Sequence, residues 1–223
     1  MEERERYRNE GYALLKGVLA EDVAGVLLAS VQQVVGEQGS RLLSDPRVAG
    51  KRSYELYGQN WRPMTTLHWG MTALMERIVG ARLAPTYSYF RAYQGGDICH
   101  VHSDREASEH SISLTLGYAD RRPWPLAIAG RPLQPEEQFK PGYAADFGGE
   151  PFREIPMSVG DAVAYQGSLY RHGRIAPNPN RWSAHLFLQW VDRDGPFGGY
   201  AFDGRQPAAP GDFIFPPEPA ATR

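Results

Sequence analysis

The chain has 223 residues, of which 24 are basic and 26 acidic, and no block of like charge. This length suffices for one sizeable core, and the even charge excludes the electrostatic footprint of a nucleic-acid-binding or membrane-surface protein. No segment reaches the roughly 18 to 20 apolar residues of a membrane span, and the densely charged start is not a secretory signal. The single cysteine, Cys99, excludes an internal disulfide and fits a reducing compartment. We therefore expect a cytoplasmic protein without nucleic-acid or membrane partners.

The N-terminal part predicts one strand and two helices. Residues 11–19 form a short apolar strand pattern after a charged, helical start. Residues 20–35 place valine and leucine at helical spacing and stop at a glycine, and residues 64–79 repeat that pattern. The turn-rich stretch 39–60 between them is predicted as a loop.

The remainder predicts a β core. The chain contains 24 glycines and 18 prolines, and 12% of its residues are aromatic, which favours short strands and many turns. Strand patterns occupy residues 86–93, 112–118, 125–128, 161–165 and 184–191. Residues 131–156 read as a long irregular connection with isolated extended pieces. Helices followed by an antiparallel β core predict an α+β, mainly β, fold.

Two histidines and one aspartate form a candidate metal-ligand set. His102 and Asp104 lie two residues apart, so both can project from one face of a strand that is ending. His172 follows 70 positions later, just beyond a turn and an apolar strand. Two imidazoles and one carboxylate on one face of a metal suit a non-haem Fe(II) with open positions.

The other histidines leave one alternative open. His100 alternates with His102 along the same strand, so a pair made by these two histidines competes with the preferred set. If it is not a ligand, His100 is expected near the mouth of the site or in solvent. His68 is predicted as a partly buried helix residue, His110 as a surface residue and His185 as a structural residue that could line a cavity.

Arg181 and Ser183 follow His172 at +9 and +11. A guanidinium meets a carboxylate through two parallel hydrogen bonds, and a hydroxyl two residues further along the strand adds a third. This pair is therefore predicted to hold the carboxylate of a co-substrate. Arg174 is the alternative anchor. Tyr93 could reach the same carboxylate from the opposite strand, or it could pack in the core.

Together these residues resemble the Fe(II)/2-oxoglutarate-dependent dioxygenase superfamily over residues 86–191. Tyr93, His102 and Asp104 have the spacing of its prolyl-4-hydroxylase-like branch, and His172 with Arg181 and Ser183 resembles the distal histidine and Arg-x-Ser anchor of other branches. The resemblance implies a double-stranded β-helix (jelly-roll, cupin-like) core with N-terminal helices packed on one sheet. The predicted division is an N-terminal strand and helical layer at 1–85, the core at 86–192 and a C-terminal loop or lid at 193–223, all in one domain.

The resemblance also implies the chemistry. Iron(II), 2-oxoglutarate and O2 are the expected cofactor and co-substrates, with ascorbate as a candidate stimulant, and succinate, CO2 and a hydroxylated product result. Asp104 argues against a halogenase, because halide needs that coordination position vacant. The expected substrate is a small molecule or natural-product intermediate; the alternatives are a protein side chain, or a cupin-like binding protein without turnover. Candidate substrate contacts are His100, Arg122 and Trp124, and aromatic residues around Gly198 and Gly199 could form a lid.

Overall fold

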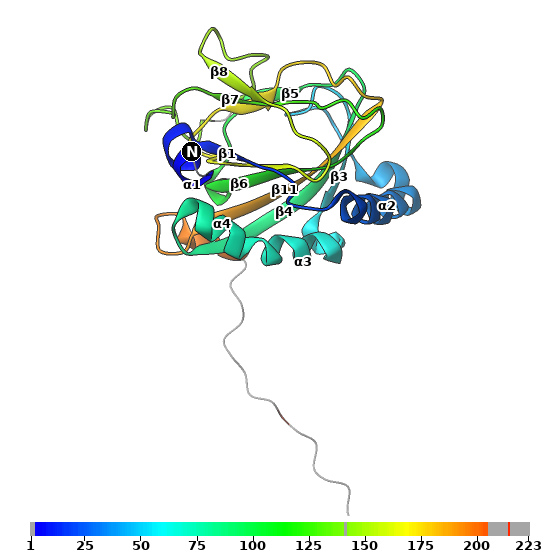
Figure 1. Ribbon diagram of the computed structural model, residues 1–223, viewed down its shortest axis with the longest axis horizontal. Coiled ribbons are helices and arrows are strands. Elements are labelled where there is room, and N and C mark those ends of the chain that lie inside the picture. Colours follow the sequence, from blue (N-terminus) through cyan, green and yellow to red (C-terminus); the bar gives the residue numbers. More distant parts are fainter. Residues whose placement is uncertain (1–2, 141, 205–213, 215–223) are drawn as a thin grey trace, which may run out of the picture.

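The structure is a computed structural model that describes residues 3–140, 142–204 and 214 (Figure 1). Two antiparallel sheets lie opposite each other. The larger has the order β1-β9-β6-β11-β4-β3-β2 and the smaller β5-β10-β7-β8. The larger contains β1 (Tyr12–Leu15), β2 (Leu43–Ser44), β3 (Ser53–Tyr57), β4 (Leu83–Gln94), β6 (His110–Tyr118), β9 (Ala162–Tyr165) and β11 (Trp182–Asp192). The smaller contains β5 (Cys99–His102), β7 (Leu126–Ala129), β8 (Phe152–Ile155) and β10 (His172–Arg174).

From β4 onward the chain alternates between the two sheets, except that β7 and β8 are neighbours in the smaller one. This is the arrangement of a double-stranded β-helix, so the predicted fold class is confirmed. The space between the sheets receives every second side chain of each strand. Any site built there therefore takes its residues from segments that are far apart in the sequence.

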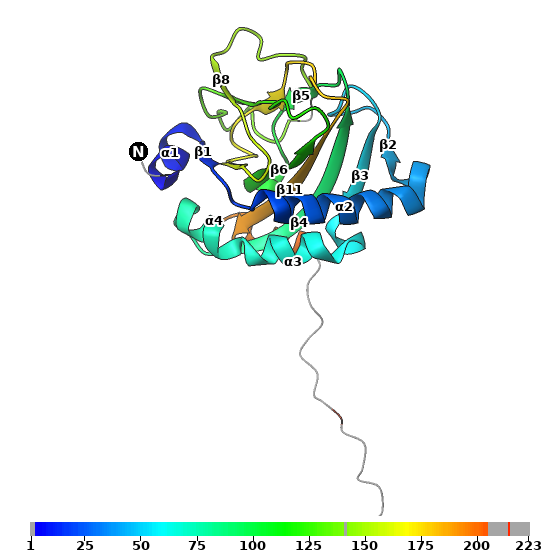
Figure 2. The same cartoon turned by 45° about the vertical axis from the view of Figure 1, so that its right-hand side comes forward.

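Helices cover the outer face of the larger sheet (Figure 2). They are α2 (Glu21–Gln38), α3 (Arg62–Gly70) and α4 (Thr72–Val79), while α1 (Glu3–Glu10) precedes β1. Short 3₁₀ turns are η1 (Gly39–Leu42), η2 (Gly58–Asn60), η3 (Glu106–Ser108) and η4 (Gly198–Gly204). On β11, Leu186, Leu188 and Trp190 are fully buried in the cluster that these helices share with the sheet. The alternate residues of β11 therefore face the space between the sheets.

Two predicted boundaries differ from the structure. The predicted helix 64–79 is two helices that meet at Met71, because Gly70 interrupts the helical run and carries the conformational cost of a glycine. The predicted loop 39–60 is wrong in part, since β2 and β3 lie within it. β3 pairs with β4 from Tyr54 to Tyr57, and this non-local pairing provides hydrogen bonds that the local sequence does not signal.

The described part of the C-terminal segment is η4. Asp203 accepts a hydrogen bond of 2.7 Å from Arg105, the neighbour of Asp104, and Phe202 packs on Trp69 with ring centroids 5.8 Å apart. The rest of the predicted lid, 205–213 and 215–223, lies outside the described residues, so the lid stays a prediction. None of the described helices is long and apolar enough to cross a lipid bilayer.

The buried histidines predict a loss of stability in acid. His68 has its Nε2 2.8 Å from the carbonyl oxygen of Gln189, and burial lowers its pKa from 6.5 to about 4. The unfolded chain therefore binds a proton near pH 6.5 that the folded chain accepts only near pH 4. The contribution of His68 to the free energy of unfolding is fully present above pH 6.5 and is lost as the pH falls toward 4. His110, predicted at the surface, is also buried, against the Tyr7 hydroxyl, and burial lowers its pKa to about 4 as well.

Urea unfolding between pH 4 and 7 tests this expectation. The side chain of a His68→Gln variant does not titrate. Its free energy of unfolding should therefore fall with decreasing pH less steeply than that of the parent protein, with a slope smaller by about 1 kcal/mol per pH unit. Parallel curves for the two proteins would contradict it.

Candidate metal and co-substrate site

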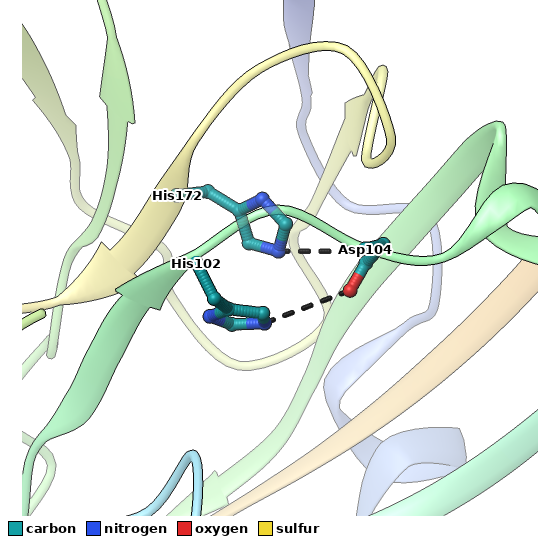
Figure 3. A group of neighbouring side chains, drawn as sticks. All are labelled: His102, Asp104 and His172. Atoms are coloured by element: carbon teal, nitrogen blue, oxygen red, sulfur yellow. Dashed lines mark ion pairs between the residues drawn. The ribbon is translucent and has the colours of Figure 1, made fainter. Parts of the chain in front are cut away.

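His102, Asp104 and His172 meet between the sheets (Figure 3). His102 ends β5 and His172 begins β10, and the two are direct partners in the antiparallel pairing of these strands. Their Nε2 atoms lie 3.6 Å and 3.7 Å from the two carboxylate oxygens of Asp104. One ligand atom from each residue lies within 4.8 Å of the others. The side chains are thus close enough to bind one ion together.

Hydrogen bonds fix both imidazoles in the tautomer that metal binding requires. His102 Nδ1 lies 2.7 Å from the carbonyl oxygen of His100, and His172 Nδ1 lies 3.0 Å from that of Tyr170. A carbonyl oxygen can only accept, so Nδ1 carries the proton and Nε2 keeps its lone pair. Burial lowers the pKa of His172 to about 4, which keeps this imidazole neutral at neutral pH.

Asp104 supplies the negative charge of the set. Burial by itself would raise the pKa of its carboxyl, but His172, His102 and the Ser111 hydroxyl outweigh burial and the pKa lies below its usual value. The Ser111 hydroxyl lies 3.4 Å from Asp104 Oδ2, and its closer partner is the side-chain oxygen of Gln189. The chain passes close by at Gly167, where a Cβ would overlap the carboxylate and Ser111. Two neutral nitrogen ligands and one carboxylate fit a divalent iron.

The predicted anchor Arg181 does not reach this site. Its side chain is 77% exposed and pairs with Asp120, with Nε 3.2 Å from Oδ1. Its backbone N–H donates to the same carboxylate, which fixes the residue on the surface just before β11 begins. Arg181 is therefore not placed to bind a carboxylate between the sheets, and the prediction requires correction.

Arg174, the alternative anchor, is buried between the two sheets. It follows His172 by two residues on β10, and its side chain is 1% exposed. Its Nη2 donates to the Ser113 hydroxyl at 3.1 Å and its guanidinium lies 5.2 Å from the centre of the Trp124 ring. Nε and Nη1 are buried without a hydrogen-bond partner among the described residues. A buried guanidinium with two free donors is costly unless an anion pairs with it.

Ser183 and Tyr93 are buried further along the larger sheet. The Ser183 hydroxyl donates to Asn178 Oδ1 at 2.7 Å, and this hydrogen bond ties the start of β11 to the turn before it. The Tyr93 hydroxyl accepts from Arg91 Nη1 at 3.1 Å, and its ring lies 5.0 Å from that of Trp124. Tyr93 therefore lies in the aromatic cluster on which Arg174 packs, whereas the Ser183 hydroxyl is already engaged.

The three candidate substrate contacts lie away from the ligands. A β-bulge shifts the register so that Arg174 pairs with Cys99, and His100 leaves the inner face and packs near Gly50. Arg122 is exposed in a loop held by Asn180. Trp124 is fully buried and donates from Nε1 to the carbonyl oxygen of Ala176 at 2.7 Å. His185, predicted as structural, is buried beside this tryptophan at a ring distance of 6.1 Å.

A groove opens beside the ligands on the solvent side. Its inner half has a volume of about 400 Å³ and includes His102 and Asp104 in its wall, together with Tyr87, Tyr89 and Tyr143. Its outer half, also about 400 Å³, extends past Glu55 toward residues 44–49. Four residues border both halves: Val48, Tyr57, Arg91 and Tyr143. His102 and Asp104 therefore lie in the wall of a continuous surface groove.

The sequence did not indicate Ser111, Gln189 or Gly167. The available signal for the first was the alternation of hydroxyl side chains at Ser111, Ser113 and Thr115, which places three polar groups on the inner face of a strand. Gly167 carried no local signal, because the need for a glycine arises from its contact with Asp104.

No family model and no curated protein matches the chain. Several solved structures match the chain in fold. The epimerase SnoN, in complex with Fe3+, alpha-ketoglutarate and nogalamycin RO, is 15% identical with a TM-score of 0.68, and the match covers 97% of this chain and 94% of that one. AviO1 from Streptomyces viridochromogenes is 21% identical with a TM-score of 0.65, covering 86% and 95%. A prolyl-4-hydroxylase from Pseudomonas putida is 15% identical with a TM-score of 0.60, covering 85% and 97%. At these identities the likeness establishes the shared fold.

Proposed function

We propose that the chain is a non-haem Fe(II)/2-oxoglutarate-dependent oxygenase that hydroxylates a small molecule. The observation that carries the proposal is the convergence of His102, Asp104 and His172, with both Nε2 atoms within 3.7 Å of the Asp104 carboxylate. The likeness in fold to a protein solved with iron and alpha-ketoglutarate supports it. When bound, iron and 2-oxoglutarate supply the oxidising chemistry: one O2 is consumed, 2-oxoglutarate becomes succinate and CO2, and the substrate gains one oxygen atom.

The residues of the chain have distinct roles in this proposal. His102, Asp104 and His172 hold the metal, and Asp104 offsets part of its charge. Arg174 binds the distal carboxylate of 2-oxoglutarate through one of its two free donors, Nε or Nη1, which lie on opposite edges of the guanidinium.

The groove supports a small molecule as substrate. Each half has a volume of about 400 Å³, within the range of about 300–1,000 Å³ that is typical of small-molecule sites. Solvent exposure by itself is compatible with a peptide, and one structure of similar fold is a prolyl-4-hydroxylase. The aromatic wall of the inner half favours a compact molecule with apolar faces.

Succinate release tests the proposal. Pure protein is incubated anaerobically with Fe(II) and 2-oxoglutarate, air is admitted, and succinate is assayed with and without ascorbate. We expect succinate well above the level of a His102→Ala control. Equal succinate from both proteins would favour a cupin-like binding protein without turnover.

A further inference from the structure

The groove has aromatic side chains in its wall next to the metal ligands. The Tyr143 ring lies 6.0 Å from the His102 ring at an angle of 63° and is 58% exposed. Its neighbour Ala144 is bound to Val101 of β5 by two backbone hydrogen bonds of 2.8 Å and 2.9 Å. Tyr143 is thus anchored beside a metal ligand while its ring is free to contact another molecule.

A second aromatic face lies across the groove. Tyr57, at the end of β3, is 45% exposed and packs against Tyr89 with ring centroids 6.0 Å apart. Tyr57 and Tyr143 both border the inner and the outer half of the groove. Exposed aromatic rings that are held from behind provide flat faces on which other rings stack.

The charges of the groove are balanced and largely paired. Four acidic and four basic residues line its two halves: Asp45, Glu55, Asp104, Glu106, Arg47, Arg91, Arg105 and Lys140. Arg91 is held by Glu55 and Arg105 by Asp203. The other two basic residues, Arg47 and Lys140, line different halves. A cluster of cations, as a phosphate or a coenzyme A group would require, is thus not found among the described lining residues.

One polar group in the wall of the outer half, beside Arg91, is available to a ligand. Glu55 Oε1 accepts both hydrogen bonds from Arg91, whereas no described residue donates to Oε2. Because Arg91 already neutralises this carboxylate, Oε2 can accept a hydrogen bond from an uncharged hydroxyl.

We infer that the substrate is an uncharged molecule built of hydroxyl-bearing rings, such as an aryl glycoside. It stacks on Tyr57 and Tyr143 and donates a hydroxyl to Glu55. The inference rests on the proposed function, because it takes the groove as the substrate site of the oxygenase. It excludes substrates that are carried on a phosphate-containing group.

Two probes with the same aromatic group test the inference. Methylumbelliferyl glucoside and methylumbelliferyl phosphate are titrated into the full chain loaded with Ni(II) and 2-oxoglutarate, and binding is followed by ligand-observed NMR. We expect the glucoside to bind at least about tenfold more tightly than the phosphate. Tyr57→Ala and Tyr143→Ala should each weaken the binding of the glucoside by about threefold to tenfold. Tyr200→Ala, which removes a ring 39% exposed on η4 outside the groove, should leave its affinity unchanged.

Tighter binding of the phosphate, no binding of either probe, or an equal loss in Tyr200→Ala would overturn the inference. Metal and 2-oxoglutarate affinities are measured on the same samples. If these two ligands bind and the glucoside does not, the substrate class is wrong and the oxygenase proposal is unaffected. If the glucoside binds and 2-oxoglutarate does not, the proposed function fails while the groove remains a binding site for rings.

Discussion

Replacing Asp104 with alanine is expected to weaken Fe(II) binding by more than about 100-fold and to reduce succinate release to background. Loss of residues that merely support metal ligands commonly costs 10- to 100-fold, and Asp104 is the only carboxylate in the proposed set. Without it, two neutral imidazoles would have to hold a divalent ion in a partly buried position. Anaerobic titration with Fe(II), followed by calorimetry, measures the change.

Asp120→Ala is the matched control for this variant. It removes a surface carboxylate that pairs with Arg181 and lies away from the ligands. Iron affinity and succinate release should stay within about twofold of the parent protein, because surface ion pairs contribute little. An Asp104→Ala protein that still binds one iron with the parent affinity would show that the metal lies elsewhere.

Replacing Arg174 with methionine is expected to weaken the binding of 2-oxoglutarate by roughly 30- to 5,000-fold. This corresponds to the loss of a buried charge-assisted pair worth about 2–5 kcal/mol. Iron affinity should change by less than about threefold, since Arg174 does not belong to the ligand set. Without 2-oxoglutarate, the variant should be at least as stable as the parent, because a buried guanidinium with free donors has been removed. Titration of the iron-loaded protein and thermal unfolding measure these effects.

Arg181→Met is the control for the anchor. Its exposed guanidinium lies on the outside of the barrel, so 2-oxoglutarate affinity should change by less than about twofold. A larger effect of Arg181→Met than of Arg174→Met would restore the anchor that the sequence spacing predicts. Equal losses of iron and 2-oxoglutarate affinity in Arg174→Met would instead mean that this arginine supports His172.

The ligand set could be predicted because each part depends on local structure. His102 and Asp104 are separated by the strand period, and His172 follows an apolar strand with a turn before it. The helices over the larger sheet were also predictable from their 3.6-residue period, although the predicted helix 64–79 is two helices. The order of helices and strands indicated an α+β fold with an antiparallel β core, whereas the double-stranded β-helix was what the resemblance implied.

The surface position of Arg181 could not be predicted from spacing, because it depends on two loops that meet only in the folded chain. Asp120 accepts hydrogen bonds from the backbone N–H and from Nε of Arg181, and these contacts hold the arginine side chain at the surface. The bulge that removes His100 from the inner face is likewise a product of the pairing between β5 and β10. The strand β3 was missed for the same reason: its hydrogen bonds come from β4.

Crystals grown anaerobically with Mn(II) and 2-oxoglutarate, with data collected to locate the metal by anomalous scattering, test the central claim most directly. A single peak should lie between the Nε2 atoms of His102 and His172 and the carboxylate of Asp104. The keto acid should chelate the same ion, with its far carboxylate on Arg174. A peak away from these three side chains, or a keto acid whose far carboxylate lies on another residue, would contradict the account.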